Sequence, residues 1–255
     1  MSSASLGNSS RFATWPVADG GTPASTWRGW QRNFPELNLD DCPGLVLVAP
    51  HPNDETLGFG ATAAALRSRG VDVQVVSVTD GGGAHRGLSR RERVWLESDR
   101  RAELLRATQI LGLSAPVTLG LPDGDLSANE PELTAFLAGL LESMPKGTWC
   151  AATWRGDGHL DHEAVGRSSA VAVGRTGATL LEYPVWMWHW ARPDDDAVPW
   201  HRMSAIRVDR AAIGRKQHAI REFRTQLTPY EPGVDPILPP FAVRRLLAVG
   251  EAVFH

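Results

Sequence analysis

Short apolar segments rich in β-branched residues alternate with longer helical segments along most of the chain. The predicted strands are Leu45–Ala49, Val71–Thr79, Pro116–Leu119, Thr148–Thr153, one within Ala178–Trp190, and Ala205–Asp209. The predicted helices are Thr56–Arg69, Ser89–Leu111, Pro131–Ser143, Asp161–Val173 and Ala211–Phe223. This alternation predicts an α/β fold with one Rossmann-like, mostly parallel sheet flanked by helices.

The length of 255 residues suits one domain of this kind. The first forty residues are rich in Ser, Gly and Pro, yet they contain Trp15, Trp27 and Trp30. Disordered tails rarely carry several large aromatic residues. We therefore expect residues 1–40 to form an N-terminal arm, which is loose over residues 1–10 and packed on the domain beyond them. The domain itself is predicted to span residues 41–255.

The charge and the cysteine content limit the binding partners and the cellular compartment that we expect for this protein. The net charge of -3 and a pI near 6.2 offer no electrostatic attraction for nucleic acid or for an anionic membrane. The sequence has no apolar run of the ~20 residues needed to span a bilayer, and its first residues do not resemble a secretory signal. Cys42 and Cys150 are the two cysteines, and Cys150 lies in an apolar strand, as a reduced core thiol would. We expect a cytoplasmic protein that binds a small molecule, and its oligomeric state stays open.

Two polar segments each follow a predicted strand. PHPNDE spans Pro50–Glu55, and GDGHLDHE spans Gly156–Glu163. In a parallel sheet both segments lie at the carboxyl edge of the strands, where ligands bind. Two imidazoles and one carboxylate form a catalytic zinc site, and they also suit other divalent transition ions. The candidate ligands are His51, Asp54, His159, Asp161 and His162.

A structural explanation of these segments exists as well. A loop histidine can cap the following helix, and acids at a helix N-terminus interact favourably with the helix dipole. On that explanation the chain is a Rossmann-like ligand-binding domain without a metal. The coincidence of both segments at matching positions favours the metal site. Nucleotide-binding glycine motifs and a G-x-S-x-G nucleophile elbow are both absent from the sequence.

PHPNDE and HLDH together resemble the motifs of the LmbE/PIG-L family of zinc-dependent N-deacetylases, which usually read (A/P)HPDDE and HPDH. The resemblance covers residues 44–227 and includes weaker motifs between and beyond these two. The weaker motifs are TDGGG at Thr79–Gly83, RRAEL at Arg100–Leu104, LPDGDL at Leu121–Leu126 and KQHAIREFRTQ at Lys216–Gln226.

The resemblance implies a role for each matching residue. His51, Asp54 and His162 would bind zinc, and a water activated by the metal would attack an amide carbonyl. His159 would act beside the metal as an acid or as a partner of the oxyanion. Asp161 would orient an imidazole ring. The implied reaction removes an N-acyl group, expected to be N-acetyl, from a small molecule that contains an amino sugar.

Asn53 departs from the family pattern, because the family has its general base, an aspartate, at this position. A neutral amide can hold a water molecule but cannot take its proton. Three explanations stay open: an engineered variant, an enzyme in which Asp157 or His159 serves as the base, and a relative that binds metal or ligand, or regulates, with little or no turnover. The first two predict a hydrolase that is attenuated by Asn53.

Three further residues are candidates for contact with the substrate. If Leu181–Trp190 is a strand, Trp186 shares one face with Trp188 and Trp190 and could stack on a sugar ring. The alternative is that these indoles form a core or a subunit interface. His85 follows the glycines of TDGGG, and Asp123 lies in the LPDG turn. Each of these two could reach the substrate, or could serve only the local turn.

Overall fold

The central strands are apolar runs buried on both faces, as parallel strands between two helical layers must be. The computed structural model describes residues 7–85 and 87–255, and within them one sheet has the strand order β3-β2-β1-β4-β5-β7-β6. Strands β1 to β5 pair in parallel, and β7 is antiparallel to both β5 and β6. The predicted α/β fold with a mostly parallel sheet is confirmed. The strands are β1 (Leu45–Ala49), β2 (Val73–Ser77), β3 (Val117–Thr118), β4 (Trp149–Thr153), β5 (Thr179–Tyr183), β6 (Met203–Ile206) and β7 (Glu251–Phe254).

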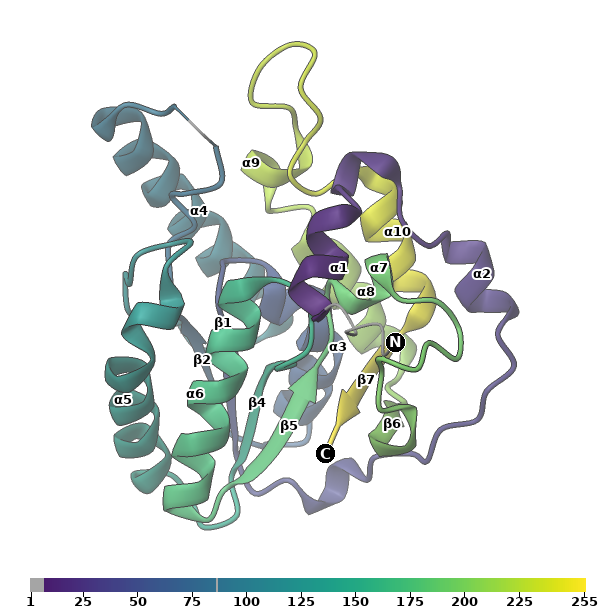
Figure 1. Cartoon of the computed structure of the whole chain (residues 1–255). Coiled ribbons are helices and arrows are strands. Elements are labelled where there is room, and N and C mark those ends of the chain that lie inside the picture. The colour runs from purple at the N-terminus through teal and green to yellow at the C-terminus, as the bar shows by residue number, and fades with distance from the viewer. Residues whose placement is uncertain (1–6, 86) are drawn as a thin grey trace, which may run out of the picture.

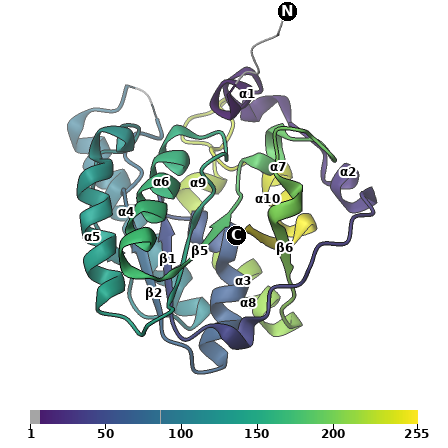
Figure 2. The same cartoon turned by 60° about the horizontal axis from the view of Figure 1, so that its bottom comes forward.

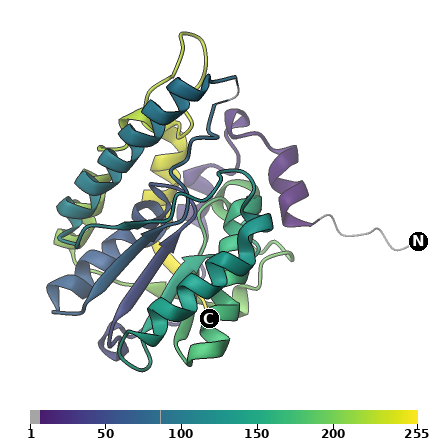
Figure 3. The ribbon, with the colours of Figure 1, turned by 90° about the vertical axis from the view of Figure 1, so that its left-hand side faces the viewer.

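Helices cover both faces of the sheet (Figure 3). One layer contains α5 (Glu130–Glu142) and α6 (Leu160–Thr176), and the other contains α3 (Asp54–Ser68), α4 (Arg90–Leu111) and α8 (Arg210–Ile220). Alternate residues of β1 serve the two layers. Leu45 and Leu47 belong to the core beneath α3, whereas Val46 and Val48 belong to the core beneath α5 and α6.

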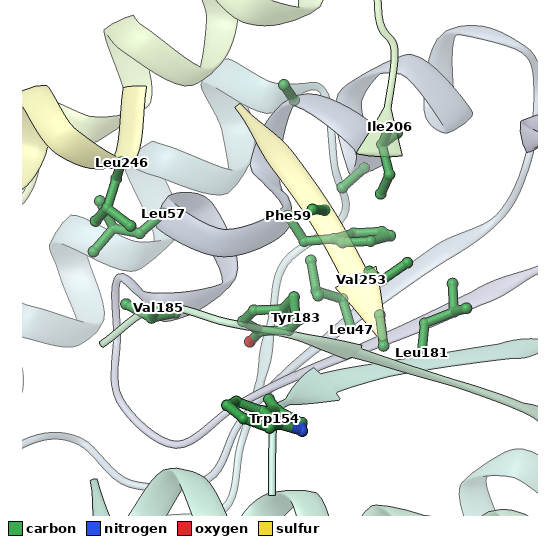
Figure 4. Close-up of a cluster of buried hydrophobic side chains, with 14 of the residues drawn as sticks. Leu47, Leu57, Phe59, Trp154, Leu181, Tyr183, Val185, Ile206, Leu246 and Val253 are labelled. Carbon is green, nitrogen blue, oxygen red and sulfur yellow. The ribbon is translucent and has the colours of Figure 1, made fainter. Parts of the chain in front are cut away.

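The packing of α3 on the sheet fixes the start of this helix. Tyr183 is fully buried, and its hydroxyl donates to the carbonyl oxygen of Val48 at 2.8 Å. Its ring lies 6.1 Å from that of Phe59 and occupies the space that a side chain at position 58 would need, which explains Gly58 (Figure 4). The first turn of α3, which carries Asp54, is therefore held at the carboxyl end of β1.

The segment after β5 differs from the prediction. The strand ends at Tyr183, and Met187–Trp190 forms the short helix α7, so the strand alternation inferred for the three tryptophans is wrong. Pro184 has no N–H to continue the sheet. The Asp157 carboxylate then accepts the backbone N–H groups of residues 185, 186 and 187, which turns the chain away from the sheet.

The C-terminal part adds elements that the sequence did not suggest. They are α9 (Arg224–Leu227), α10 (Pro240–Val249) and strand β7. Strand β6 begins two residues before the predicted position and ends at Ile206. None of the helices within residues 7–85 and 87–255 combines the length and apolar character needed to cross a membrane.

The N-terminal segment runs along one side of the sheet (Figures 1 and 2). It contains α1 (Asn8–Thr14) and α2 (Ala24–Gly29), with short 3-10 helices at Val17–Asp19 and Leu39–Asp41. Helix α2 packs on α10, and α1 lies beside α7. Residues 8–10 of the segment predicted to be loose are helical, and residues 1–6 lie outside the described residues. The division of the chain at residue 40 stays a prediction.

Candidate metal centre and its pocket

Two loops at the carboxyl edge of the sheet carry the candidate ligands. His51 follows β1, and Asp54 is the first residue of α3. His159 caps the N-terminus of α6, and His162 lies in the first turn of that helix, after β4. Strands β1 and β4 are direct parallel neighbours, so the two loops meet above the sheet.

His51, Asp54 and His162 converge on one point. Oδ2 of Asp54 lies 3.2 Å from Nδ1 of His51 and 3.3 Å from Nε2 of His162. One ligand atom from each of the three residues lies within 4.8 Å of the other two, as binding to a single ion requires. Both ring nitrogens of His162 are buried and neither makes a well-aligned hydrogen bond, although each lies close to a carboxylate. An orphaned imidazole nitrogen that faces a carboxylate fits a site for a divalent cation.

Carboxylates stand behind both imidazoles. Oδ2 of Asp157 lies 2.8 Å from Nδ1 of His162. Nε2 of His51 lies 2.9 Å from Asp123 and 3.2 Å from Asp161. Carboxylates in such positions fix the orientation and the tautomer of a metal-binding histidine.

Asp161 and Asp157 divide the orienting role in a way that the sequence did not indicate. Asp161 faces His51, and it also accepts the backbone N–H groups of Gly124 and Leu126. The carboxylate that faces His162 belongs to Asp157, which the sequence suggested only as a replacement base. A signal was present, because two ligand imidazoles need two orienting groups and Asp157 lies in the same GDGHLDHE segment.

The acids and the imidazoles shift one another's pKa values. Burial lowers the pKa of His51, but its contacts with Asp123, Asp161 and Asp54 raise it well above the ordinary value. Burial likewise opposes the charge on His162, but Asp54 and Asp157 raise the pKa of His162 to about 9. The neighbouring imidazoles hold the pKa of Asp54 well below its usual range, against the effect of its burial.

His159 has the opposite shift. Burial, together with the charges of His162 and His51, lowers the pKa of His159 to about 3, so its ring is neutral at neutral pH. Its Nδ1 accepts the backbone N–H of Asp161 at 3.2 Å. This hydrogen bond assigns the ring proton to Nε2, which makes that nitrogen a hydrogen-bond donor.

Asn53 is held by several contacts in an unusual backbone conformation. Its φ angle is 142°, a region that residues other than glycine rarely occupy. Its backbone N–H donates to Glu55 at 3.0 Å, and its side-chain amide donates to Oε1 of Gln226. Oε1 of Gln226 also accepts from Arg100 at 3.1 Å, and the Gln226 amide donates to the carbonyl oxygen of Pro52 at 2.8 Å.

A pocket of about 350 Å³ opens onto this cluster. Six of the predicted site residues line it: His51, Asn53, Asp54, Asp123, His159 and Trp186. His162 and Asp161 are buried and are not among the residues that line this pocket. His85 does not line the pocket, since its ring stacks on Tyr230 at 4.6 Å, so its position lends no support to substrate contact.

Arg100, Gln226 and Phe12 also line the pocket, and they were not predicted as site residues. The glycines of TDGGG make room for two charged groups. Gly81 has a φ of 71°, and a side chain there would collide with the Arg100 guanidinium. The N–H of Gly83 donates to Asp123 at 2.7 Å. Arg100 and Gln226 do lie in the motifs RRAEL and KQHAIREFRTQ, which are the signals that could have identified them.

Loops from neighbouring parallel strands that bring two imidazoles and a carboxylate to one pocket define an α/β protein with a candidate metal-hydrolase site. Residues 46–173 match the PIG-L family, described as GlcNAc-PI de-N-acetylase. This match spans half of the chain, and the chain belongs to the PIG-L family.

One curated relative is the 1D-myo-inositol 2-acetamido-2-deoxy-alpha-D-glucopyranoside deacetylase of Mycobacterium leprae (strain Br4923). It is 32% identical over 162 residues, which cover 54% of this chain and 53% of the relative. The chain thus spans about half the length of the curated relatives it matches.

Two solved structures share the fold. The conserved protein TT1542 from Thermus thermophilus has a TM-score of 0.53 and 26% identity, covering 71% of this chain and 79% of the other. The N,N'-diacetylchitobiose deacetylase from Pyrococcus horikoshii has a TM-score of 0.56 and 21% identity, covering 74% of this chain and 73% of the other.

Proposed function

We propose that this protein is a metal-dependent amide hydrolase that removes an N-acyl group, expected to be N-acetyl, from a small molecule containing an amino sugar. The observation that carries the proposal is the convergence of His51, Asp54 and His162 at an open pocket. Membership in the PIG-L family supports it, as does a relative whose name states deacetylation of a 2-acetamido sugar.

His51, Asp54 and His162 would hold the ion, and the pocket leaves a position for substrate beside them. The donor set of two imidazoles and one carboxylate suits zinc and other divalent transition ions. When bound there, the ion supplies Lewis-acid polarisation of the substrate carbonyl and of a water molecule. Asp157 would keep the His162 ring oriented for this task, and Asp161 and Asp123 would do the same for the His51 ring.

His159 would stabilise the negative charge that develops on the carbonyl oxygen. Its ring is neutral, and its Nε2–H remains available because Nδ1 accepts the N–H of Asp161. A donor that is already oriented before the reaction costs no reorganisation in the transition state. Asp123 and Arg100, which also line the pocket, supply an acceptor and a donor for sugar hydroxyl groups.

Proton removal from the attacking water is the weak step. Asn53 can position the water but cannot accept its proton. Asp157 is a poor replacement, because its carboxylate already accepts three backbone N–H groups and faces His162. The low pKa of His159 makes it a weak base. We therefore expect turnover to be about 10²–10⁴ lower than with a carboxylate at position 53.

Asn53 also favours a second candidate function: a metal-binding, ligand-binding or regulatory relative with little or no turnover. Metal content and acetate release separate the two. We expect close to one equivalent of bound divalent metal, since the two possible ligand groups, His51–Asp54–His162 and His51–His159–Asp161, share His51. We also expect slow acetate release from N-acetyl amino-sugar glycosides. Bound metal with no acetate release, in this chain and in Asn53→Asp, would favour the binding protein.

The variant His162→Ala tests the site itself. It should lose both the metal and the activity, because it removes a ligand that is fully buried. The matched control is His218→Ala, which removes an exposed imidazole on α8 and should retain both. Metal binding that survives His162→Ala would refute the proposed ligand set.

A further inference from the structure

A second hollow opens next to the pocket of the candidate metal centre. Its volume is about 510 Å³, and it shares Phe12, Gly124 and His159 with the pocket. The two spaces therefore lie next to each other and share these three residues. A substituent on a ligand at the metal centre would need to pass only these residues to reach the second hollow.

The exposed surface of the second hollow is largely apolar, although it is also lined by Ser9, Ser10, His159 and Asp161. Phe12 and Ala13 of α1 line one part of it, and Leu160 at the start of α6 lines another. Leu160 is 64% exposed, more than any other large hydrophobic side chain in the described residues. Single exposed leucines are ordinary, but here one faces the same space as Phe12, between two residues of the candidate site. Such a combination is typical of a surface that receives an apolar group.

Helix α1 forms a defined wall although none of its residues is fully buried. The Phe12 ring lies 5.4 Å from that of Trp186 and 6.1 Å from that of His159. The side chain of Asn8 donates to the carbonyl oxygen of Gly156 at 2.8 Å. These contacts hold α1 above the carboxyl ends of the strands, beside α7 (Figure 1).

Hydrogen bonds from α10 and α7 hold the segment that follows α1. Arg245 of α10 is buried, and it donates to the backbone carbonyl oxygens of Gly20 and Thr22. Its guanidinium also lies 3.0 Å from Nδ1 of His189, whose Nε2 lies 2.9 Å from the carbonyl oxygen of Trp15. The arm is thus bound on both sides of its 3-10 turn, by His189 of α7 before the turn and by Arg245 of α10 after it.

We infer that the second hollow is a subsite for an apolar substituent of the amino-sugar substrate, such as an alkyl chain. The α1 side of its wall consists of Ser9, Ser10, Phe12 and Ala13, which lie outside the part of the chain that matches the PIG-L family. The inference rests on the proposed function for the sugar, but it does not depend on turnover. The alkyl group can be attached to the sugar through the glycosidic oxygen or through the amide, and in both cases it offers the same methylene groups to the subsite.

Affinity measured by calorimetry on the zinc-loaded full chain tests the subsite. One comparison is octyl against methyl 2-acetamido-2-deoxyglucoside, and the other is N-octanoyl against N-acetyl glucosamine. Each buried methylene multiplies affinity by about four, so two or three of them give a gain of about tenfold or more. A gain in the first comparison assigns the subsite to the aglycone, and a gain in the second assigns it to the acyl chain. The absence of a gain in both would overturn the inference.

Variants tie any gain to this wall. Phe12→Ala and Leu160→Ala should each reduce the ratio of octyl to methyl affinity by about threefold or more, because each removes apolar contact area. Leu105→Ala, which truncates an exposed leucine on α4, should leave the ratio unchanged. A ratio that persists in both Phe12→Ala and Leu160→Ala would place the alkyl chain elsewhere and refute the subsite. Absence of acetate release would count against the proposed hydrolase and leave this affinity ratio interpretable.

Discussion

Asn53→Asp should raise the rate of the proposed hydrolysis, because it places a carboxylate at the position of the missing general base. Asn53 precedes the candidate ligand Asp54 in the sequence, and its side chain lines the pocket. A carboxylate at this position could take the proton of the attacking water. General-base catalysis contributes about 10²–10⁴ in rate, which equals about 2.7–5.5 kcal/mol of activation free energy. Asp has the same branching and nearly the same size as Asn, so the substitution adds no steric reason for the backbone at φ 142° to change.

The surroundings of Asn53 impose a cost on the same change. Its amide donates to Oε1 of Gln226, and that oxygen also accepts from Arg100. A carboxylate at position 53 would face this oxygen and repel it. If the Gln226 side-chain amide rotates by about 180°, it loses the hydrogen bonds to Arg100 and to the carbonyl oxygen of Pro52. Each lost bond costs about 1 kcal/mol, so the free energy of unfolding should fall by about 2 kcal/mol.

The gain and the cost appear in different measurements. The strain at Gln226 is present in the free enzyme and in the transition state alike, so it cancels in kcat/KM and remains in the stability. We expect acetate release by the zinc-loaded variant to rise by about 10²-fold or more, while urea unfolding shows the loss of stability.

Asn33→Asp is the matched control, because it adds the same charge at an exposed position outside the pocket. It should change neither the rate nor the stability appreciably. If Asn53→Asp keeps its metal and still hydrolyses no faster than the parent chain, position 53 does not face the attacking water, and the argument for attenuation fails.

Three further outcomes follow from the buried polar groups. His159→Ala should retain its metal but lower kcat by about 10²–10³, the value of one oxyanion donor; metal loss equal to that of His162→Ala would show that the two histidines were assigned wrongly. Lys216→Met should lower the free energy of unfolding by about 3–5 kcal/mol, because the buried Lys216 ammonium lies 2.7 Å from the buried Glu251 carboxylate. Adding Glu251→Gln should recover part of that loss, whereas full additivity of the two losses in urea unfolding would argue against the pair. Burial raises the pKa values of Cys42 and Cys150 to about 12, from 9.0. The folded state thus keeps both thiols neutral, and their contribution to stability is complete below pH 9 and lost as the pH rises from 9 toward 12. The free energy of unfolding should fall there by about 2.7 kcal/mol per pH unit for the two thiols together, and replacing both by Ala should remove that part of the slope.

The parts of the fold and the site that the sequence predicted depend on local signals. Leu45–Ala49 reads as a buried strand because every residue in it is apolar, and the motif that follows must lie at the strand's carboxyl end. The same reasoning located His162 after β4, and the two strands are neighbours. The prediction that the two loops meet did not require the register between the strands, because parallel pairing alone brings both loops to one edge of the sheet.

The missed features depend on contacts between distant parts of the chain. The strand predicted through Trp186 fails because Asp157, almost thirty residues earlier, accepts the N–H groups of residues 185–187. Gln226 reaches Asn53 across 173 positions of sequence. Phe12 enters the pocket wall only because α1 packs beside α7. No periodicity or spacing encodes such pairings, which the packing of the whole chain decides.

The charge balance of the cluster explains why its acids can be buried without a lysine or arginine for each. Asp54, Asp157 and Asp161 are buried and Asp123 nearly so, and the raised pKa values of His51 and His162 place a proton on each ring. Those two protons carry the charge that a divalent ion brings, so an ion that displaces them leaves the balance with the carboxylates unchanged. Ligand histidines must lose their protons to bind metal. The acids that orient the rings therefore stabilise the cluster with either occupant, and the cation must compete with the protons for the two rings.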